Sequence, residues 1–172
     1  MKNNHFLLFV LLGLLSSFQS RAQDQEIKVG GNAPEIRLPT PKGDTVSLSS
    51  VKGDLILVDF WASWCAPCVL EQPELKRLYG VHNIPNALGR KLEIFAVSLD
   101  SKKQSWQNAI KKYQIPWYQV SDLKFWISPV ARDYHIDSLP FNVLLDSKRV
   151  IVALNLHGKE LEEFVEAYLQ RK

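Results

Sequence analysis

The chain has only two cysteines and one methionine among its 172 residues, and both cysteines lie in the stretch WASWCAPC at 61–68. A structural zinc site needs four ligands, and two cysteines with histidines scattered without ligand spacing argue against one. Covalent attachment of a c-type haem needs a histidine directly after the second cysteine, where this chain has Val69. The scarcity of ligands thus turns attention to the cysteines themselves.

The sequence also lacks an apolar run of the length that a membrane-spanning helix needs, about 20 residues. The run at 6–15 is about half that length, follows a basic residue and precedes small polar residues. These features predict a secretory signal peptide over residues 1–22, cleaved after Ala22 and followed by one domain over residues 23–172. We expect a periplasmic or otherwise exported soluble protein, with retention of residues 6–18 as a membrane anchor as the less favoured alternative.

An excess of charge of one sign is lacking as well. The whole chain has a net charge of +3, and loss of residues 1–22 leaves 19 basic against 18 acidic residues. Such a balance implies no nucleic-acid or anionic-membrane partner. The paired lysines at 102–103 and 111–112 fit the solvated face of a helix.

Strand and helix patterns alternate along the chain and together predict an α/β fold with a mixed sheet between helices. The near-continuous apolar runs LILVDFW and LEIFAVSLD are typical of central strands buried on both faces. The expected strands lie at 35–38, 45–48, 55–61, 92–100, from 117, 141–146 and 150–156. The expected helices lie from Pro67 to Gly80, at 105–113, at 128–135 and from 159.

The cysteine pair is either a structural disulfide or a redox centre. A four-residue loop is a poor staple, because closing it stabilises a fold by about 2 kcal/mol at most, against about 4 to 5 kcal/mol for loops near 100 residues. Redox exchange fits better, since Cys65 falls at the start of the helix containing Pro67, where free backbone N–H groups stabilise a thiolate. Cys68 lies one turn further on and can attack the mixed disulfide that Cys65 forms. We therefore predict an attacking Cys65, a resolving Cys68 and no cofactor besides this pair.

The stretch LVDFWASWCAPC at 57–68 resembles the active-site strand and helix start of the thioredoxin superfamily. GGNAPEIRLPTPKGDTVSLSSVKGD at 30–54 is similar to the N-terminal hairpin that exported TlpA/ResA-type thiol-disulfide oxidoreductases share with peroxiredoxins. CAPCVLEQPEL at 65–75 resembles the same exported branch. The resemblance extends from about Gly30 to the final helix. It implies a thioredoxin-like three-layer fold with an extra N-terminal β-hairpin, and thiol-disulfide oxidoreductase activity.

The resemblance also implies site residues around the cysteines. In this family a cis-proline faces the disulfide, and Pro140 in DSLPFNVLLDSKRVI has the matching position. Its implied role is to present the backbone of Leu139 to an extended substrate segment. The pair at 141–142, Phe-Asn, replaces the threonine-rich pair common in the family. The resemblance therefore does not predict the surface that faces the partner, although the cysteine chemistry is unaffected. Asp59 matches the buried aspartate of thioredoxin, a proton acceptor for Cys68; the alternative is a strand-end aspartate that reaches water.

Four further residues near the cysteines or rich in chemistry have less specific interpretations. Glu71 matches an acid implicated near the active site of ResA-like proteins, although an acidic residue is also ordinary near a helix N-terminus. Trp64 is a candidate substrate contact, and packing is the alternative for Trp64 and for Trp61. We assign no catalytic role to His135.

The direction of electron flow follows from the charges near the cysteines. Strong oxidants of this fold stabilise the thiolate unusually well, whereas carboxylates at Asp59 and Glu71 oppose this. The sequence therefore predicts a reductant that passes electrons from a membrane thiol protein to cysteines of exported client proteins, with cytochrome c maturation as one setting. The resemblance to the family, and nothing else, implies a monomer.

Other functions stay open as alternatives. A copper-binding chaperone would use Cys65, Cys68 and His135, although the only methionine is Met1. A disulfide-introducing oxidase of the same fold would use the same two cysteines. A peroxidase is disfavoured, because it needs Thr or Ser three residues before its reactive cysteine and Ala62 stands there.

Overall fold

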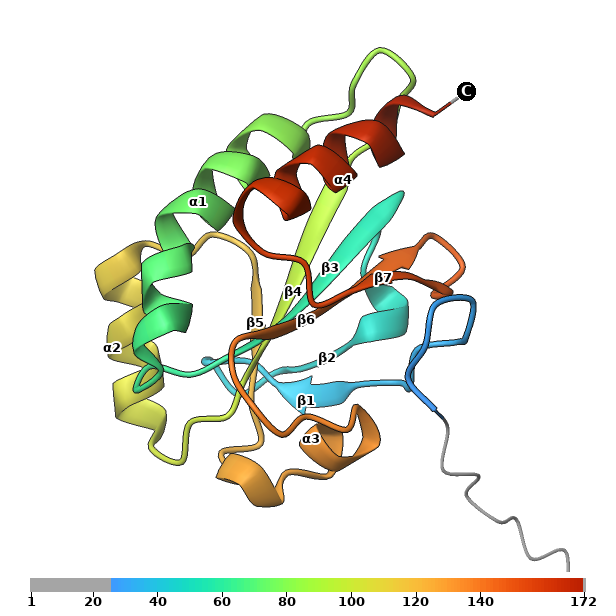
Figure 1. Cartoon of the computed structure of the whole chain (residues 1–172). Coiled ribbons are helices and arrows are strands. Elements are labelled where there is room, and N and C mark those ends of the chain that lie inside the picture. Colours follow the sequence, from blue (N-terminus) through green and yellow to red (C-terminus); the bar gives the residue numbers. More distant parts are fainter. Residues whose placement is uncertain (1–25, 172) are drawn as a thin grey trace, which may run out of the picture.

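The computed structural model describes residues 26–171 (Figure 1). The predicted signal peptide and its cleavage site lie outside the described residues. Within residues 26–171, no helix has both the length and the apolar character needed to cross a lipid bilayer.

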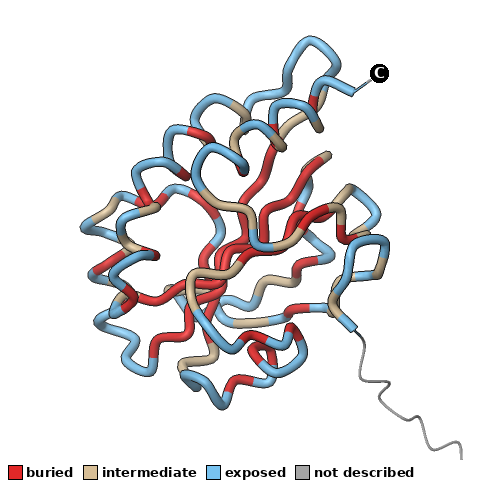
Figure 2. Tube along the Cα trace, viewed as in Figure 1, coloured by how far each residue is buried: buried red, intermediate tan, exposed pale blue. Residues whose placement is uncertain are grey.

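Five strands form a mixed sheet in the order β5-β4-β3-β6-β7. They are β3 (Leu55–Trp61), β4 (Leu92–Ser98), β5 (Tyr118–Val120), β6 (Phe141–Asp146) and β7 (Ile151–Leu154). β3 pairs in parallel with β4, which pairs in parallel with β5, whereas β6 is antiparallel to both β3 and β7. All seven residues of β3 and of β4 are buried, as Figure 2 shows for the centre of the molecule. This burial explains their continuous apolar sequences.

Helices and the N-terminal hairpin cover opposite faces of the sheet (Figure 1). Alternate residues of β3 pack with α1 (Ala66–His82), α2 (Lys103–Tyr113) and α4 (Gly158–Gln170) in one core. The intervening residues pack in a second core with α3 (Pro129–Asp133) and with residues flanking the hairpin. The expected α/β fold with a mixed sheet between covering layers is confirmed.

The hairpin consists of β1 (Arg37–Pro39) and β2 (Thr45–Ser47), which form a separate antiparallel sheet. Its turn contains Gly43 at φ 105°, a conformation that favours glycine. The buried side chains of Ile36 and Leu48 connect it to the second core. The extra N-terminal hairpin is thus confirmed, with its first strand two residues later than expected.

Several expected boundaries were wrong for local reasons. α1 continues beyond Gly80 because this glycine keeps a helical conformation, and the cap is Asn83. α2 begins earlier than expected because its N-cap, Lys102, makes no side-chain capping bond that would mark it in the sequence. β7 ends at Leu154 because Asn155 has φ 51°, outside the range of a strand.

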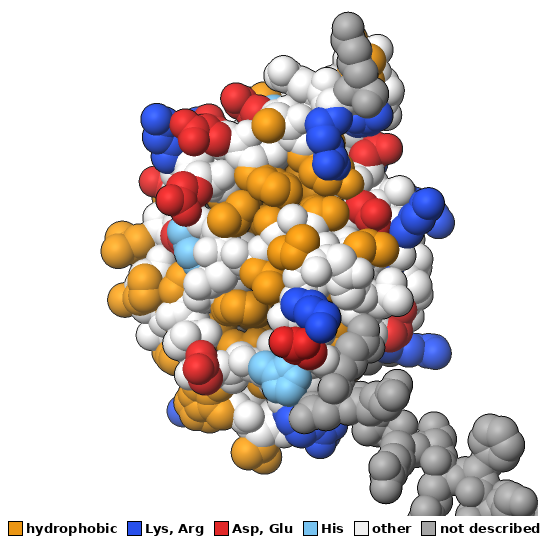
Figure 3. Space-filling model, turned by 45° about the vertical axis from the view of Figure 1, so that its right-hand side comes forward, with side chains coloured by type: hydrophobic (Ala, Val, Ile, Leu, Met, Phe, Trp, Pro, Cys, Tyr) orange, Lys and Arg blue, Asp and Glu red, His pale blue; other side chains and the backbone are white. Residues whose placement is uncertain are grey.

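Two short 3-10 turns, at Leu48–Ser50 and Phe125–Ile127, were not expected. On the face shown in Figure 3, Lys and Arg side chains alternate with Asp and Glu around a band of hydrophobic side chains. This face therefore has no extended patch of one charge.

Candidate active site

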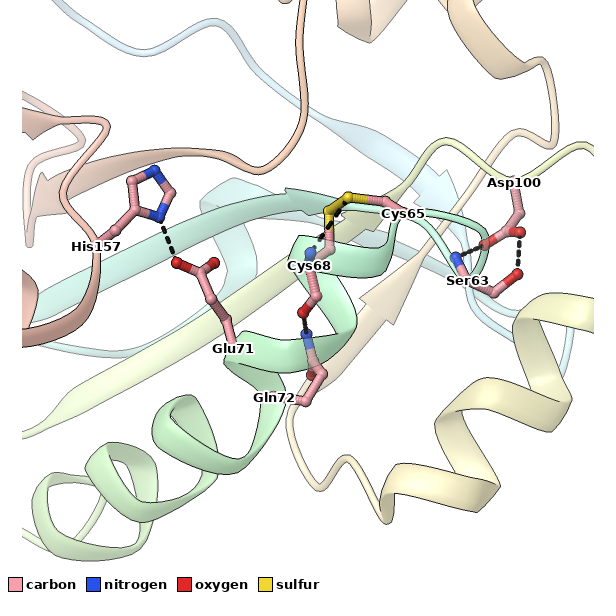
Figure 4. The surroundings of a disulfide bond; sticks show 7 residues. All are labelled: Ser63, Cys65, Cys68, Glu71, Gln72, Asp100 and His157. Atoms are coloured by element: carbon pink, nitrogen blue, oxygen red, sulfur yellow. Dashed lines mark hydrogen bonds and ion pairs between the residues drawn. A yellow bond between two sulfur atoms is a disulfide. The ribbon is translucent and has the colours of Figure 1, made fainter.

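The two cysteines form a disulfide where β3 leads into α1 (Figure 4). Cys65 is the N-cap of α1, and its Sγ accepts a hydrogen bond from the backbone N–H of Cys68 at 3.2 Å. This N–H has no partner within the helix, and the Cys65 sulfur at the N-cap satisfies it. Cys65 is 5% exposed and Cys68 is 1% exposed. Cys65 is therefore the more exposed of two buried cysteines.

A serine–aspartate contact holds the loop before the cysteines. The backbone N–H and the hydroxyl of Ser63 donate to Asp100 at 2.9 and 2.6 Å (Figure 4). Ser98 donates its hydroxyl to the same carboxylate at 2.7 Å. Sequence reasoning missed this contact. Its signal is the polar Ser98 and Asp100 at the carboxyl end of a strand parallel to β3, because such ends meet at one edge of a sheet.

The Leu139–Pro140 peptide bond is cis and directly precedes β6. β6 is antiparallel to β3, with Phe141 opposite Phe60, so this bond lies at the edge of the sheet where β3 leads to Cys65. Leu139 is half-buried and contacts both cores. The fold thus places the proline loop and the disulfide at one end of the molecule.

The Asp59 side chain is buried, at 3% exposure, and its Oδ2 has no hydrogen-bond partner in the described structure. It shares a face of β3 with Leu57 and Trp61, which pack in the core that contains both cysteines. Burial raises the pKa of Asp59 to about 7, and the negative charge of Glu71 contributes to this rise. The alternative of a strand-end aspartate that reaches water was wrong.

Glu71 forms a close pair with a histidine that sequence reasoning did not single out. Its Oε1 lies 2.7 Å from Nδ1 of His157, at the start of α4 (Figure 4). The other ring nitrogen of His157, Nε2, lies 2.9 Å from Oδ1 of Asn155. Glu71 therefore has a specific side-chain partner, in addition to being an acidic residue near the start of a helix.

Asn142, where the chain departs from the family pattern, anchors the segment that carries this histidine. Its amide nitrogen donates to the carbonyl of Leu156 at 2.6 Å, and its amide oxygen accepts from the Leu156 N–H at 3.2 Å. Asn142 stands opposite Asp59 in the β3–β6 pair. The sequence signal for this role was an amide next to the apolar residues 143–145 of a predicted strand.

An exposed aromatic cluster lies next to the disulfide. The ring of Trp64, which precedes Cys65, lies 5.1 Å from that of Phe125 and 6.1 Å from that of Trp126, centre to centre. All three rings are at least 36% exposed. Trp61, by contrast, is fully buried and donates from Nε1 to Gln119 at 3.1 Å. Trp61 is therefore a core packing residue, and Trp64 lies on the surface.

No group of three or more His, Cys, Asp or Glu residues that could hold a metal ion occurs within residues 26–171.

Residues 29–155 match the AhpC/TSA family model, and the match includes the hairpin, both cysteines and Pro140. Thiol-disulfide oxidoreductase ResA of Bacillus cereus is 29% identical over 187 aligned residues, covering 99% of this chain and 98% of that protein. The chain belongs to the AhpC/TSA family, among its TlpA/ResA-like thiol-disulfide oxidoreductases.

Two further comparisons agree with this family. Thioredoxin-like protein YneN of Bacillus subtilis is 31% identical over 144 residues, covering 80% of this chain and 78% of that protein. The C-terminal domain of a putative thiol-disulfide oxidoreductase from Bacteroides thetaiotaomicron has a TM-score of 0.75 and 34% identity, covering 83% of this chain and 97% of that domain. This TlpA/ResA-like protein is thus an enzyme that exchanges disulfides with cysteine-containing substrate proteins.

Burial of Asp59 predicts an unusual dependence of stability on pH. In the oxidised protein the cysteines do not titrate, and the pKa of Asp59 rises from 3.8 to about 7 on folding. The folded state therefore keeps a proton that the unfolded chain releases, so stability is greatest below about pH 4 and falls as the pH rises towards 7. Between pH 5 and pH 8 we expect a loss of about 2 to 3 kcal/mol from this group.

Urea unfolding of the oxidised protein at both pH values measures this loss, and Asp59→Asn should remove most of it. Parallel losses in the two proteins would mean that Asp59 ionises normally.

Proposed function

We propose that this oxidoreductase works as an exported reductant that delivers two electrons to disulfides of exported client proteins. The observation that carries the proposal is the acidic surroundings of the cysteine pair. Asp59 is buried on the face of β3 whose apolar residues pack in the same core as the cysteines, Glu71 lies one turn further along α1, and Ala66-Pro67 between the cysteines carries no cation. Carboxylates oppose build-up of the Cys65 thiolate, so the dithiol form gives up its electrons readily.

The reaction proceeds in two exchanges. The Cys65 thiolate attacks one sulfur of a client disulfide, an S–S bond forms between them, and the second client sulfur leaves as a thiolate. Asp59 then takes the proton of the Cys68 thiol, and the Cys68 sulfur attacks Cys65. The Cys65–Cys68 bond forms, the mixed disulfide breaks, and the first client sulfur leaves with the electron pair. The client is reduced by two electrons, and the protein is left as the disulfide.

Export and a membrane partner complete the proposal. The charged start, short apolar run and small polar residues at 1–22 support secretion. Return to the dithiol form then requires an electron donor that crosses or faces the membrane, and we propose a membrane thiol protein. Maturation of cytochromes c is one setting that needs such reduction. The protein needs no cofactor beyond the cysteine pair and acts as a monomer.

Client segments are proposed to lie across the edge where the disulfide and the cis peptide bond meet. The backbone of Leu139 would pair with the segment on one side, and Trp64 would contact it on the other. The support for this is position: Trp64 is adjacent to Cys65 in the chain, is 47% exposed and is packed against Phe125.

The reduction potential of the Cys65–Cys68 pair tests the direction of electron flow. Equilibration with dithiol buffers, followed by tryptophan fluorescence, should give about −250 mV or lower, near thioredoxin. A value of about −120 to −180 mV would instead indicate a protein that introduces or rearranges disulfides. Cys68→Ser is the control for mechanism, because it should trap the mixed disulfide on Cys65. Tight copper binding without disulfide turnover would favour the copper chaperone.

The aromatic cluster predicts a difference between large and small substrates. Trp64→Ala or Trp126→Ala should slow reduction of a protein disulfide about ten-fold, the effect of losing about 1.4 kcal/mol of contact with an aromatic anchor. Reduction of a small disulfide such as oxidised glutathione should change little. Ile84→Ala, at an exposed apolar residue just after α1, is the matched control. Equal slowing of both substrates would show an effect on the cysteines instead of on client binding.

A further inference from the structure

We propose that His157 is a positioning residue for thiol–disulfide exchange, which holds Glu71 in a defined pair and thereby tunes how fast Cys68 resolves the mixed disulfide. The inference rests on the proposed role of Asp59 as the acceptor of the Cys68 proton. It adds a residue that lies 86 positions from Glu71 in the sequence.

Both ring nitrogens of His157 face oxygen atoms. Nδ1 is 2.7 Å from the Glu71 carboxylate, and Nε2 is 2.9 Å from the amide oxygen of Asn155. A neutral imidazole can donate only one hydrogen bond, whereas the imidazolium donates both. The arrangement is therefore fully bonded when His157 carries the charge that compensates Glu71.

The position of this ring is set by the sheet. The Asn155 N–H donates to the Asn142 carbonyl at 2.7 Å, and the Asn142 side chain holds Leu156 through two hydrogen bonds. The side chains of His157 and Glu71 are 31% and 23% exposed. Solvent and salt therefore screen this pair less than an exposed one.

Glu71 connects the pair to the cysteines. It follows Cys68 by three residues on α1, and its charge acts on the buried Asp59 carboxyl. A cavity of about 220 Å³ opens beside Glu71 between α1 and α4.

The other charged groups around this cavity are paired or do not act on Asp59. Arg77 and Glu162 bond to each other through two contacts of 2.7 Å, and Lys159 pairs with a glutamate on its own helix. Glu74 also lines the cavity, on the same helix as Glu71. Of all these groups, only Glu71 contributes to the raised pKa of Asp59.

The consequence has a definite sign. A Glu71 carboxylate without its histidine exerts its full negative charge on Asp59 and favours the protonated form. Fewer molecules then have an Asp59 carboxylate ready to accept the Cys68 proton near pH 7. His157 thus speeds resolution near neutral pH, and this advantage disappears at a pH where Asp59 is fully ionised.

Titration of the Asp59 carboxyl carbon by NMR in the oxidised full-length protein tests the electrostatic step. His157→Phe keeps a ring but no donor, and should raise the titration midpoint by about 0.5 pH unit or more. Glu71→Gln should lower the midpoint. The double variant should titrate like Glu71→Gln alone, because His157 acts through Glu71. His82→Gln, which removes a histidine at the far end of α1, is the matched control and should cause no shift.

The kinetic step is measured with reduced protein and a saturating peptide disulfide, where resolution limits the rate. His157→Phe should be about two-fold slower at pH 7, because a rise of about half a unit from a pKa of about 7 lowers the ionised fraction of Asp59 from about one half to about one quarter, and it should reach or exceed the wild-type rate at high pH. A purely structural defect would instead lower the rate at every pH. If His157→Phe does not fold, His157→Gln should show a smaller shift of the same sign.

An unchanged Asp59 midpoint in His157→Phe, or a shift that persists in the Glu71→Gln background, would overturn the proposal. If the Asp59 midpoint shifts but the pH dependence of the rate is unchanged, the kinetic role of His157 is overturned. Asp59 would then not be the acceptor of the Cys68 proton. Disulfide exchange that is slow in the wild-type protein itself would count against the proposed function, while the NMR result would still decide the coupling.

Discussion

Asp59 carries a carboxyl group into the core on a strand whose other six residues are apolar, and one of its oxygens has no hydrogen-bond partner within residues 26–171. Burial of an unpaired carboxylate is costly, and the group responds by keeping its proton up to about pH 7. Asp59 is buried because β3 is the central strand of the sheet, paired on both sides and covered on both faces. The neighbouring polar residues then matter through the charge that they place near this carboxyl.

The topology of the sheet explains why the site lies at one edge. The carboxyl ends of the parallel strands β3 and β4 meet there, which brings Ser63 next to Asp100. β6 is antiparallel and begins at the same edge, which brings the cis bond before Phe141 beside the loop to Cys65. Three segments far apart in the sequence are thus brought together by strand register, and the Ser63–Asp100 contact joins two of them.

Sequence reasoning succeeded where the signal is local. The buried strands, the helix after the cysteines and the hairpin follow from composition and periodicity, and the cis bond at Pro140 came from the resemblance alone. The pairing of Glu71 with His157 could not be predicted, because it depends on where α4 begins relative to α1. The same holds for Trp64 and Phe125, which meet only because a loop with Leu123 and Phe125 at positive φ turns back towards the cysteines. Asn142 did carry a local signal, an amide next to apolar residues of a predicted strand, but its partner in the following loop required the structure.

The free energy that burial of Asp59 costs in stability equals the free energy by which burial eases proton transfer from a thiol to Asp59. A thiol of ordinary pKa, about 8.5, loses its proton to a carboxylate of pKa 3.8 at a cost of about 6 kcal/mol, but to one of pKa about 7 at about 2 kcal/mol. The roughly 4 kcal/mol by which burial makes the carboxylate a better base is the same free energy that destabilises the fold at neutral pH. A partner that neutralised Asp59 directly would restore stability and remove the base. In the proposed mechanism, a histidine bonded to Glu71 instead of to Asp59 adjusts the charge near the buried carboxyl without pairing its Oδ2, so Asp59 would remain available as the base.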